Sequence, residues 1–166
     1  MTVRSVAAAA GCSTTGVYTW FGGKNGLVEA IFVDGFERFG AAVRVAGDAA
    51  PGPERVRARA LAYRTWALAN PTHYTVMFGH AVPDFEPSPA ASLAAQRTFT
   101  DLVVSVTAAI DHGDLAGEPF EIAHHLWAGI HGYVSLEIAG MGLTPEPERP
   151  AAFVAGVERL LRGCRP

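Results

Sequence analysis

Apolar residues recur every three to four positions over long stretches of this chain, which is the spacing of a helix with one buried face. Alternating strand patterns with turn dipeptides are missing, and alanine is abundant, which favours helices. The pattern predicts helices over residues 3–10, 14–21, 24–46, 54–69, 72–79, 90–110, 119–139 and 147–162. We therefore expect an all-α fold, in which an N-terminal helix-turn-helix precedes a helical bundle.

Three clusters of proline and glycine interrupt this pattern, at residues 51–53, 82–89 and 140–147. The first cluster follows the longest predicted helix and is the clearest break in the chain. It predicts two domains: residues 1–46 hold the helix-turn-helix and its connecting helix, and residues 47–166 form a second helical domain.

The composition mainly excludes other classes of protein. The 166 residues include 49% hydrophobic and 17% charged side chains, typical of a globular protein, and the net charge of −3 excludes a general polycation. Long apolar runs and a signal peptide core are missing, so we expect a cytoplasmic protein without membrane spans. Cys12 and Cys164 form no disulfide framework, and we expect Cys12 to be a buried apolar side chain rather than a reactive thiol.

Charge is distributed unevenly along the chain. Residues 1–33 carry Arg4 and Lys24 against Glu29, a net charge of +1, whereas the rest carries 11 basic and 15 acidic residues, a net charge of −4. Lys24 opens a predicted helix, where its charge opposes the helix dipole but a phosphate group would be attracted. The N-terminal end is therefore expected to favour binding of a polyanion. The alternative is that Lys24 is an ordinary surface lysine in contact with water.

Residues 2–21 have the spacing of two short helices joined by a tight turn. The hydroxyls of Thr2 and Ser13 are placed to cap the two helices, and Gly11 suits a left-handed turn residue. The contact between the helices is predicted to use small and apolar residues, Val6, Ala7, Ala10, Cys12 and Val17, with Gly11 in the turn.

The outer face of the second helix is predicted to carry small and hydroxyl-bearing residues: Ser13, Thr14, Thr15, Gly16, Tyr18 and Thr19. Serine and threonine hydroxyls bind phosphates and base edges, and a threonine methyl can contact a thymine methyl. This face therefore fits close approach to DNA, and it also fits an ordinary helical hairpin with a polar outer side.

In the second domain, large apolar residues recur in three stripes at helical spacing. The stripes are Tyr63, Trp66, Tyr74, Met77 and Phe78; Leu93, Phe99, Val103, Val106 and Ile110; and Phe120, Trp127, Val134 and Ile138. Such stripes form a plain core or line a pocket between bundle helices, and in a pocket they would favour a small apolar or aromatic ligand. The candidate lining residues are Tyr63, Trp66, Met77, Phe78, Phe99, Val103, Trp127 and His131.

Histidines accompany the third stripe, but they predict no catalytic or metal centre. Glu121, His124 and His131 share one face of a predicted helix, and no ligand on a second helix completes a metal site. His131 fits a buried or pocket-facing hydrogen-bonded histidine, and His125 is expected to face solvent. Because nucleophile elbows, phosphate-binding glycine loops and paired carboxylates are missing, we expect neither an enzyme nor a cofactor.

The segments Thr2–Ala7, Ala10–Ser13, Val17–Phe21 and Lys24–Leu27 together resemble the DNA-binding region of TetR-type transcriptional regulators. The Gly-x-Ser turn, the Tyr-x-x-Phe pair and the lysine that follows make this combination specific. The resemblance implies that the chain binds operator DNA through this region.

Carried over position by position, the resemblance assigns a DNA contact to several residues of this chain. Those expected to contact phosphates are Thr2, Tyr18, Trp20 and Lys24, and those expected to face base edges are Thr14, Thr15 and Gly16. Trp20 departs from the histidine or tyrosine frequent in the family. Gly26 departs from a usually polar position, which predicts a looser start to the next helix.

A second resemblance, to the ligand-binding domain of a TetR subgroup with a Trp-His-Gly signature, lies in the segments 127–133 and 70–78. It implies an effector pocket in the central helices and a homodimer built by the helices at 119–139 and 147–162. Small residues would permit close helix approach in that dimer: Ala128, Gly129 and Gly132. Its apolar seam would consist of Phe153, Val157, Leu160 and Leu161. Packing of the seam inside its own chain is the alternative.

The two resemblances imply a ligand-responsive, homodimeric DNA-binding regulator, most often a repressor that a small apolar or aromatic effector releases from its operator. TetR-type proteins carry one more helix before the helix-turn-helix, and we expect that helix to be missing from this incomplete motif. A start codon placed too late or a truncated sequence is the expected cause. The alternative is a small-molecule-binding dimerisation module that does not bind DNA.

Overall fold

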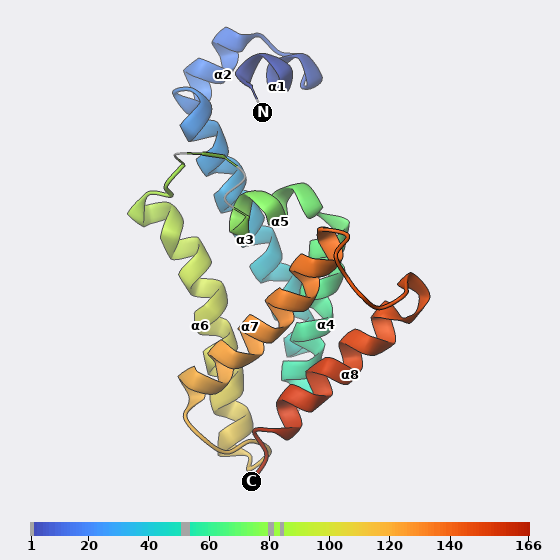
Figure 1. The fold of residues 1–166 in the computed structure, drawn as a ribbon. Helices are drawn as coiled ribbons and strands as arrows, with labels where there is room; N and C mark the ends of the chain where they lie inside the picture. The colour runs from blue at the N-terminus through green and yellow to red at the C-terminus, as the bar shows by residue number, and fades with distance from the viewer. Residues whose placement is uncertain (1, 51–53, 80–81, 84) are drawn as a thin grey trace. The chain divides into compact units, whose positions relative to one another are not determined.

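The computed structural model describes residues 2–50, 54–79, 82–83 and 85–166, and these residues form helices without a strand (Figure 1). In chain order the elements are α1 (Val3–Ala9), α2 (Thr14–Phe21), α3 (Lys24–Asp48), α4 (Glu54–Ala69), α5 (Pro71–Phe78), α6 (Pro89–Asp111), α7 (Pro119–Ile138), the short 3-10 helix η1 (Glu146–Glu148) and α8 (Arg149–Arg162). The predicted all-α fold is confirmed, and each predicted helix lies within about two residues of its expected ends.

Local caps set the boundaries of the first two helices. The Thr2 hydroxyl accepts a hydrogen bond from the backbone N–H of Ser5 at 3.1 Å, and the Ser13 hydroxyl accepts one from Gly16 at 3.0 Å. Between the two helices Gly11 adopts a left-handed conformation with φ of 64°, which glycine reaches without steric cost. The predicted caps and turn of residues 2–16 are confirmed.

Two compact units make up the fold. The first holds the chain up to Arg38 together with Thr72–Gln96, and the second holds Phe39–Pro71 and Arg97–Pro166. Helices α3 and α6 each contribute residues to both units. The domain boundary expected after residue 46 falls inside α3 and stays a prediction.

The predicted breaks are described only in part. Residues 51–53 lie outside the described residues, and so does Asp84 in the second break. In the third break, Gly140 ends the turn after α7 with φ of 69°. Across the described ranges, no helix has the length and hydropathy needed to cross a bilayer.

Aromatic rings form part of the core of the first unit. The ring of Phe78 on α5 contacts Phe36 on α3 at a centroid distance of 5.2 Å and Tyr74 at 4.9 Å. Beside them, a Cβ on Gly35 would lie 2.7 Å from the sulfur of Met77. Glycine at this position therefore lets α5 approach α3 closely.

A smaller apolar cluster holds α1 and α2 together. Its buried members are Ala7, Val17 and Leu27, and partly buried residues surround them: Val3, Val6, Phe21 and Ile31. Ala7 and Val17 are thus confirmed as contact residues, whereas Ala10 and Cys12 are exposed. The prediction of a buried Cys12 is wrong. Helix α1 ends at Ala9, so Ala10 and Cys12 lie in the exposed turn that follows it.

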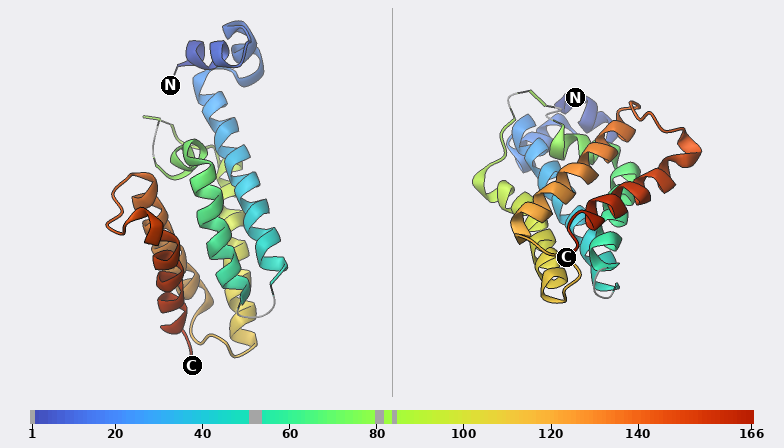
Figure 2. Two further views of the ribbon diagram at one scale, coloured as in Figure 1. Left: turned by 90° about the vertical axis from the view of Figure 1, so that its right-hand side faces the viewer. Right: turned by 60° about the horizontal axis from the view of Figure 1, so that its bottom comes forward.

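In the second unit, α4, α7 and α8 pack against one another (Figure 2). A Cβ on Gly129 of α7 would come within 2.6 Å of Leu160 on α8, so glycine allows these two helices to approach closely. Phe153, Val157 and Leu161 of α8 are buried within the chain. These three residues of the predicted dimer seam therefore pack inside their own chain, which is the alternative stated above.

A paired ion bridge also ties α4 to α7. The Arg64 Nε donates to one carboxylate oxygen of Glu137 at 2.8 Å, and a terminal nitrogen donates to the other at 2.6 Å. The side chains are only 16% and 15% exposed, and the guanidinium carbon lies 5.7 Å from the ring centroid of Phe153 on α8. The pair therefore fixes the register of three helices at once.

Candidate functional sites

Helix α2 turns one side chain inward and most of the others to solvent. Val17 is buried at 3% exposure, whereas Tyr18 and Trp20 are 58% and 77% exposed. The remaining candidate DNA contacts of this helix and its cap are also exposed, except Gly16, which is half-buried: Ser13, Thr14, Thr15 and Thr19. A short polar helix whose outer face is open in this way can approach a groove of DNA closely.

Some hydroxyls on this face have structural partners and others do not. The Thr19 hydroxyl donates to the carbonyl oxygen of Thr15 at 2.9 Å, and the Ser13 hydroxyl caps the helix. In the part of the chain that the structure describes, the Thr14 and Thr15 hydroxyls make no hydrogen bond within the protein. These two hydroxyls can therefore form hydrogen bonds with a ligand without breaking a hydrogen bond inside the protein.

The link from α2 to α3 depends on three glycines. Gly22 and Gly23 have φ of 68° and 125°, and Lys24 follows them as the exposed first residue of α3. A Cβ on Gly26 would overlap the carbonyl oxygen of Phe21 and lie 2.9 Å from its carbon. Only glycine therefore lets the first turn of α3 pass the end of α2, and the expectation that Gly26 loosens the start of α3 stays a prediction.

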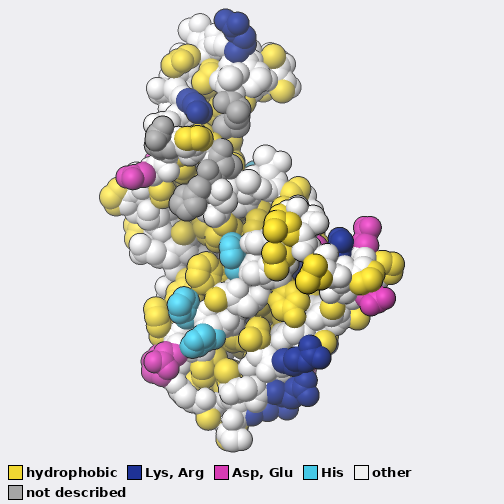
Figure 3. All heavy atoms as spheres, in the orientation of Figure 1, with side chains coloured by type: hydrophobic (Ala, Val, Ile, Leu, Met, Phe, Trp, Pro, Cys, Tyr) yellow, Lys and Arg dark blue, Asp and Glu magenta, His cyan; other side chains and the backbone are white. Residues whose placement is uncertain are grey.

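The charge of this end of the chain is basic. Arg4 and Lys24 are both exposed, and the first acidic residue in the sequence is Glu29. Figure 3 shows basic side chains at the end of the molecule that the N-terminal helices form, with an acidic side chain farther from that end on the same face. The N-terminal helices therefore suit a negatively charged partner.

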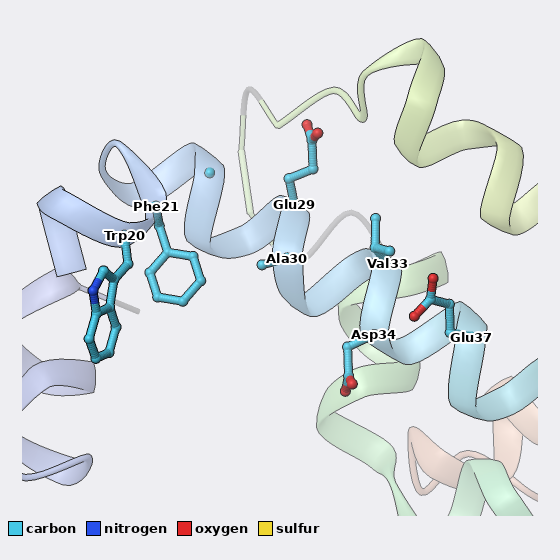
Figure 4. A pocket seen from close by; sticks show the side chains of 8 residues that line it. Trp20, Phe21, Glu29, Ala30, Val33, Asp34 and Glu37 are labelled. Carbon is cyan, nitrogen blue, oxygen red and sulfur yellow. The ribbon is translucent and has the colours of Figure 1, made fainter. Parts of the chain in front are cut away.

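An open groove of about 500 Å³ lies between the end of α2 and the first half of α3 (Figure 4). It is lined by Trp20, Phe21, Gly26, Glu29, Ala30, Val33, Asp34 and Glu37. Two of its carboxylates have partners, since Glu29 accepts from the Ser88 hydroxyl at 2.8 Å and Asp34 lies 3.4 Å from Arg38. The sequence pattern missed this groove, because its lining residues alternate between small, aromatic and acidic side chains.

A second site lies in the other unit, around His131 on α7. The Tyr63 hydroxyl on α4 lies 3.0 Å from Nδ1 of His131, and the Ser135 hydroxyl lies 3.2 Å from Nε2. Tyr63 is buried and His131 is half-buried. Both ring nitrogens therefore bond to neutral hydroxyls, as predicted for a hydrogen-bonded histidine.

Aromatic rings extend this site on both sides. Phe39 contacts Tyr63 at a centroid distance of 4.9 Å and Trp66 at 5.3 Å. Trp127 lies 5.6 Å from His131 and 6.1 Å from Phe99. Within the second unit, these contacts connect the predicted lining residues Tyr63, Trp66, Phe99, Trp127 and His131.

The other predicted lining residues lie elsewhere. Met77 and Phe78 belong to the first unit, whereas Val103 is half-buried on α6 in the second. Phe39 and Ser135 were not predicted, although Phe39 continues an apolar helical stripe and Ser135 follows His131 by one turn.

The exposed histidines next to this site do not form a metal centre. His124 and His125 are exposed, which confirms the prediction for His125. Within the ranges that the structure describes, no group of three metal-ligating side chains comes together.

Burial lowers the pKa of His131 below its ordinary value. The unfolded chain therefore binds this proton more readily, and the free energy of unfolding is expected to fall as the pH drops from about 7 to 5. A His131→Gln variant should show a shallower decrease in urea unfolding over the same range, and His125→Gln should not. An equal slope for His131→Gln and the wild-type chain would contradict this cause.

Comparison with known proteins identifies the class. Residues 56–160 match the family described as "Tetracyclin repressor-like, C-terminal domain". The match covers more than half of the chain, so this protein belongs to the TetR family of transcriptional regulators.

The HTH-type transcriptional regulators Rv1816 of Mycobacterium tuberculosis and Mb1846 of Mycobacterium bovis are relatives in sequence. Each is 26% identical over an alignment of 170 positions that spans 84% of this chain and 73% of the relative. The alignment extends beyond the matched C-terminal domain.

Solved structures agree with the fold. A protein of unknown function from Rhodococcus sp. RHA1 superimposes with a TM-score of 0.82 at 27% identity, covering 100% of this chain and 85% of its own. The TetR family transcriptional regulator PfmR from Thermus thermophilus has a TM-score of 0.75 at 16% identity, with 100% and 87% covered. The latter likeness shows the fold alone.

Proposed function

We propose that this protein is a homodimeric transcriptional repressor that binds operator DNA through α2 and is released by a small apolar or aromatic effector. The observation that carries the proposal is the open outer face of α2, where unbonded threonine hydroxyls meet a basic end of the chain. Such a regulator works in the cytoplasm, where its operator is.

In this proposal α2 enters the major groove. Thr14, Thr15 and Gly16 face base edges, because they occupy its first turn, where recognition helices contact bases. The residues that hold the DNA backbone are Thr2, Ser13, Tyr18, Thr19, Trp20 and Lys24. Phosphate contacts set affinity and position, whereas base contacts set the sequence preference.

Lys24→Ala tests the backbone contact. The variant should bind every DNA sequence more weakly and lower the slope of log affinity against log salt by about 1, because one phosphate contact is lost. Fluorescence anisotropy over a range of salt concentrations measures both effects. Arg38→Ala is the control, since Arg38 is exposed and pairs with Asp34 at 3.4 Å. Equal affinity and slope for Lys24→Ala and the wild-type chain would contradict the proposed contact.

The dimer is proposed to form on the outer stripe of α7. Ala128, Gly132 and Leu136 follow one another at intervals of four residues, and Leu136 is 48% exposed. A Cβ on Gly132 would meet nothing within 4 Å. Small residues beside an exposed leucine let a second copy of α7 approach closely.

Gly132→Arg tests this interface. Because the added side chain points into open space, the variant should keep its helical circular dichroism spectrum while losing the dimer, with a mass of 17.5 kDa by light scattering. Gly132→Ala should remain dimeric. A Gly132→Arg variant that is still dimeric would contradict the proposed interface.

Release from the operator is proposed to follow from differential binding. An effector that binds the DNA-incompetent arrangement more tightly weakens DNA binding, and the usual coupling is about 1–3 kcal/mol per site. The ring cluster around His131 supports an aromatic effector, because it joins five of the predicted lining residues.

A second candidate function is a ligand-binding dimerisation module that does not bind DNA. It is supported by the thin cluster between α1 and α2, which has few buried members, and by the open groove along α3. Binding of the purified chain to operator DNA and to effector, measured on the same preparation, separates the two functions. Effector binding and dimer formation without any DNA binding would favour the module.

A further inference from the structure

The groove between the end of α2 and the first half of α3 has an apolar floor. Gly26, Ala30 and Val33 line it and follow one another on α3 at intervals of four and three residues, so they share a face of the helix. The volume of about 500 Å³ lies within the range of small-molecule sites, which is about 300–1,000 Å³. Because two of the three floor residues are small, a flat molecule can lie close against α3.

Two aromatic side chains, Trp20 and Phe21, line one end of the groove (Figure 4). Trp20 is 77% exposed, whereas Phe21 is half-buried. Among the described residues, neither ring contacts another aromatic ring. The face of a tryptophan ring attracts cations more strongly than that of any other side chain, and it also stacks on flat rings. The aromatic end is therefore open to a flat cationic partner.

The charged side chains that the structure places in the lining of the groove are acidic: Glu29, Asp34 and Glu37. Glu29 accepts hydrogen bonds from the hydroxyl of Ser88 at 2.8 Å and from its backbone N–H at 3.3 Å, and both donors are neutral. Glu37 is exposed and makes no hydrogen bond or ion pair with any residue that the structure describes. Two of the three carboxylates therefore keep their negative charge without a basic partner.

Basic groups near the third carboxylate do not line the groove. Arg38 and His73 have nitrogen atoms 3.4 and 3.5 Å from the carboxylate of Asp34, and neither belongs to the lining. The side chains of Arg38 and Asp34 are 58% and 53% exposed, so water screens this pair. A groove lined by charges of one sign attracts ions of the other sign. The charge of this groove is therefore complementary to a cation.

We infer that this groove binds an aromatic cation, a flat ring system that carries one amidinium or ammonium group. The rings of Trp20 and Phe21 contact the ring system, Ala30 lies beneath it, and Asp34 and Glu37 pair with the cationic group. The groove belongs to the first unit, whereas the ring cluster around His131 belongs to the second. The inference therefore assigns a second ligand, separate from the effector of the proposed function.

Calorimetric titration of the purified protein with 2-naphthamidine and 2-naphthamide tests the class. The two probes have the same ring system and nearly the same shape, but only the amidine is a cation at neutral pH. At low salt the amidine is expected to bind at least about fivefold more tightly, and the difference should narrow at about 0.5 M salt, because exposed charges are screened. Equal affinity for the two probes at low salt, or no binding of the amidine at millimolar concentrations, would overturn the inference.

A charge variant then tests the acidic side of the groove. Glu37→Gln should weaken the amidine by about threefold and leave the amide unchanged, because the variant removes a charge and keeps the shape of the side chain. Glu121→Gln is the matched control, since Glu121 is an exposed carboxylate on α7 in the other unit and its loss changes the net charge equally. Equal affinity of Glu37→Gln and Glu121→Gln for the amidine would contradict the proposed pairing.

A ring variant tests the aromatic end. Trp20→Ala should weaken both probes by about fivefold, because both use the same ring contact, and the exposed position keeps the fold intact. Leu143→Ala is the control, since Leu143 is a fully exposed apolar side chain in the other unit. A Trp20→Ala variant that binds both probes as the wild-type chain does would contradict the aromatic contact.

These titrations need no DNA, so the inference and the proposed function can fail separately. DNA binding without any amidine binding would overturn the cation site and leave the regulator in place. The predicted amidine and variant pattern in a chain that never binds DNA would support the site and contradict the repressor.

Discussion

Glu137→Ala is expected to lower the free energy of unfolding by about 3–5 kcal/mol, because it leaves the Arg64 guanidinium buried without its carboxylate. Both hydrogen bonds of the pair are short, at 2.8 and 2.6 Å, and the two side chains are only 16% and 15% exposed. Urea denaturation followed by circular dichroism measures the loss.

Two controls separate burial of charge from loss of contact. Arg64→Met combined with Glu137→Met removes both charges and should recover most of the lost stability. Asp101→Ala breaks the more exposed pair with Arg44 and should cost less than about 1 kcal/mol. Equal losses of stability for Glu137→Ala and Asp101→Ala would contradict the explanation that a buried, unpaired Arg64 charge causes the larger loss.

Gly26→Ala is expected to abolish DNA binding and to destabilise the N-terminal helices by about 3 kcal/mol. The added Cβ would overlap the Phe21 carbonyl, which is backbone and cannot rotate away as a side chain could. The start of α3 must then shift away from the end of α2, and the proposed contact of Lys24 moves with it. Thermal unfolding and anisotropy with operator DNA measure the two effects.

Gly16→Ala is the matched control for folding. Its Cβ would lie 3.5 Å from the Ser13 hydroxyl, which is ordinary van der Waals contact, so the melting temperature should not fall. A Gly26→Ala variant with wild-type melting and DNA binding would contradict the steric explanation.

The helices of this protein could be predicted from the sequence because their signals are local. Thr2 and Ser13 each cap a backbone N–H three residues further along the chain. Gly11 turns the chain two residues after α1 ends. The same holds for the exposed hydroxyls of α2, which follow from one buried position at Val17 and the period of the helix. This part of the candidate DNA site was therefore predictable from the chain alone.

Contacts between distant helices could not be predicted in the same way. Tyr63 and His131 are 68 positions apart, and Arg64 and Glu137 are 73 positions apart. Periodicity shows that each lies on a helix but gives no register between two helices. The candidate lining residues were therefore chosen by type, and their role stays a prediction. Ring contacts and a hydrogen bond link five of them in the second unit, whereas Met77 and Phe78 lie in the first.

Glycines inside helices were harder to interpret than the turn glycine Gly11. Gly26 departs from the family pattern and suggested a weaker helix, yet its position against the Phe21 carbonyl requires the missing side chain. Gly129 suggested a dimer contact, yet it lies against Leu160 of its own chain. In both positions the reason depends on a neighbour that only the three-dimensional structure provides.

Recognition of operator DNA by the outer face of α2 can be tested by selection from a random pool of duplex DNA with the purified protein. A near-palindromic sequence should be enriched, with half-sites about one helical turn, or about 10 base pairs, apart. Thr15→Ala should change the preferred base within each half-site. A pool that stays random after repeated rounds, at salt concentrations where the Lys24 contact should hold, would contradict recognition of DNA by α2.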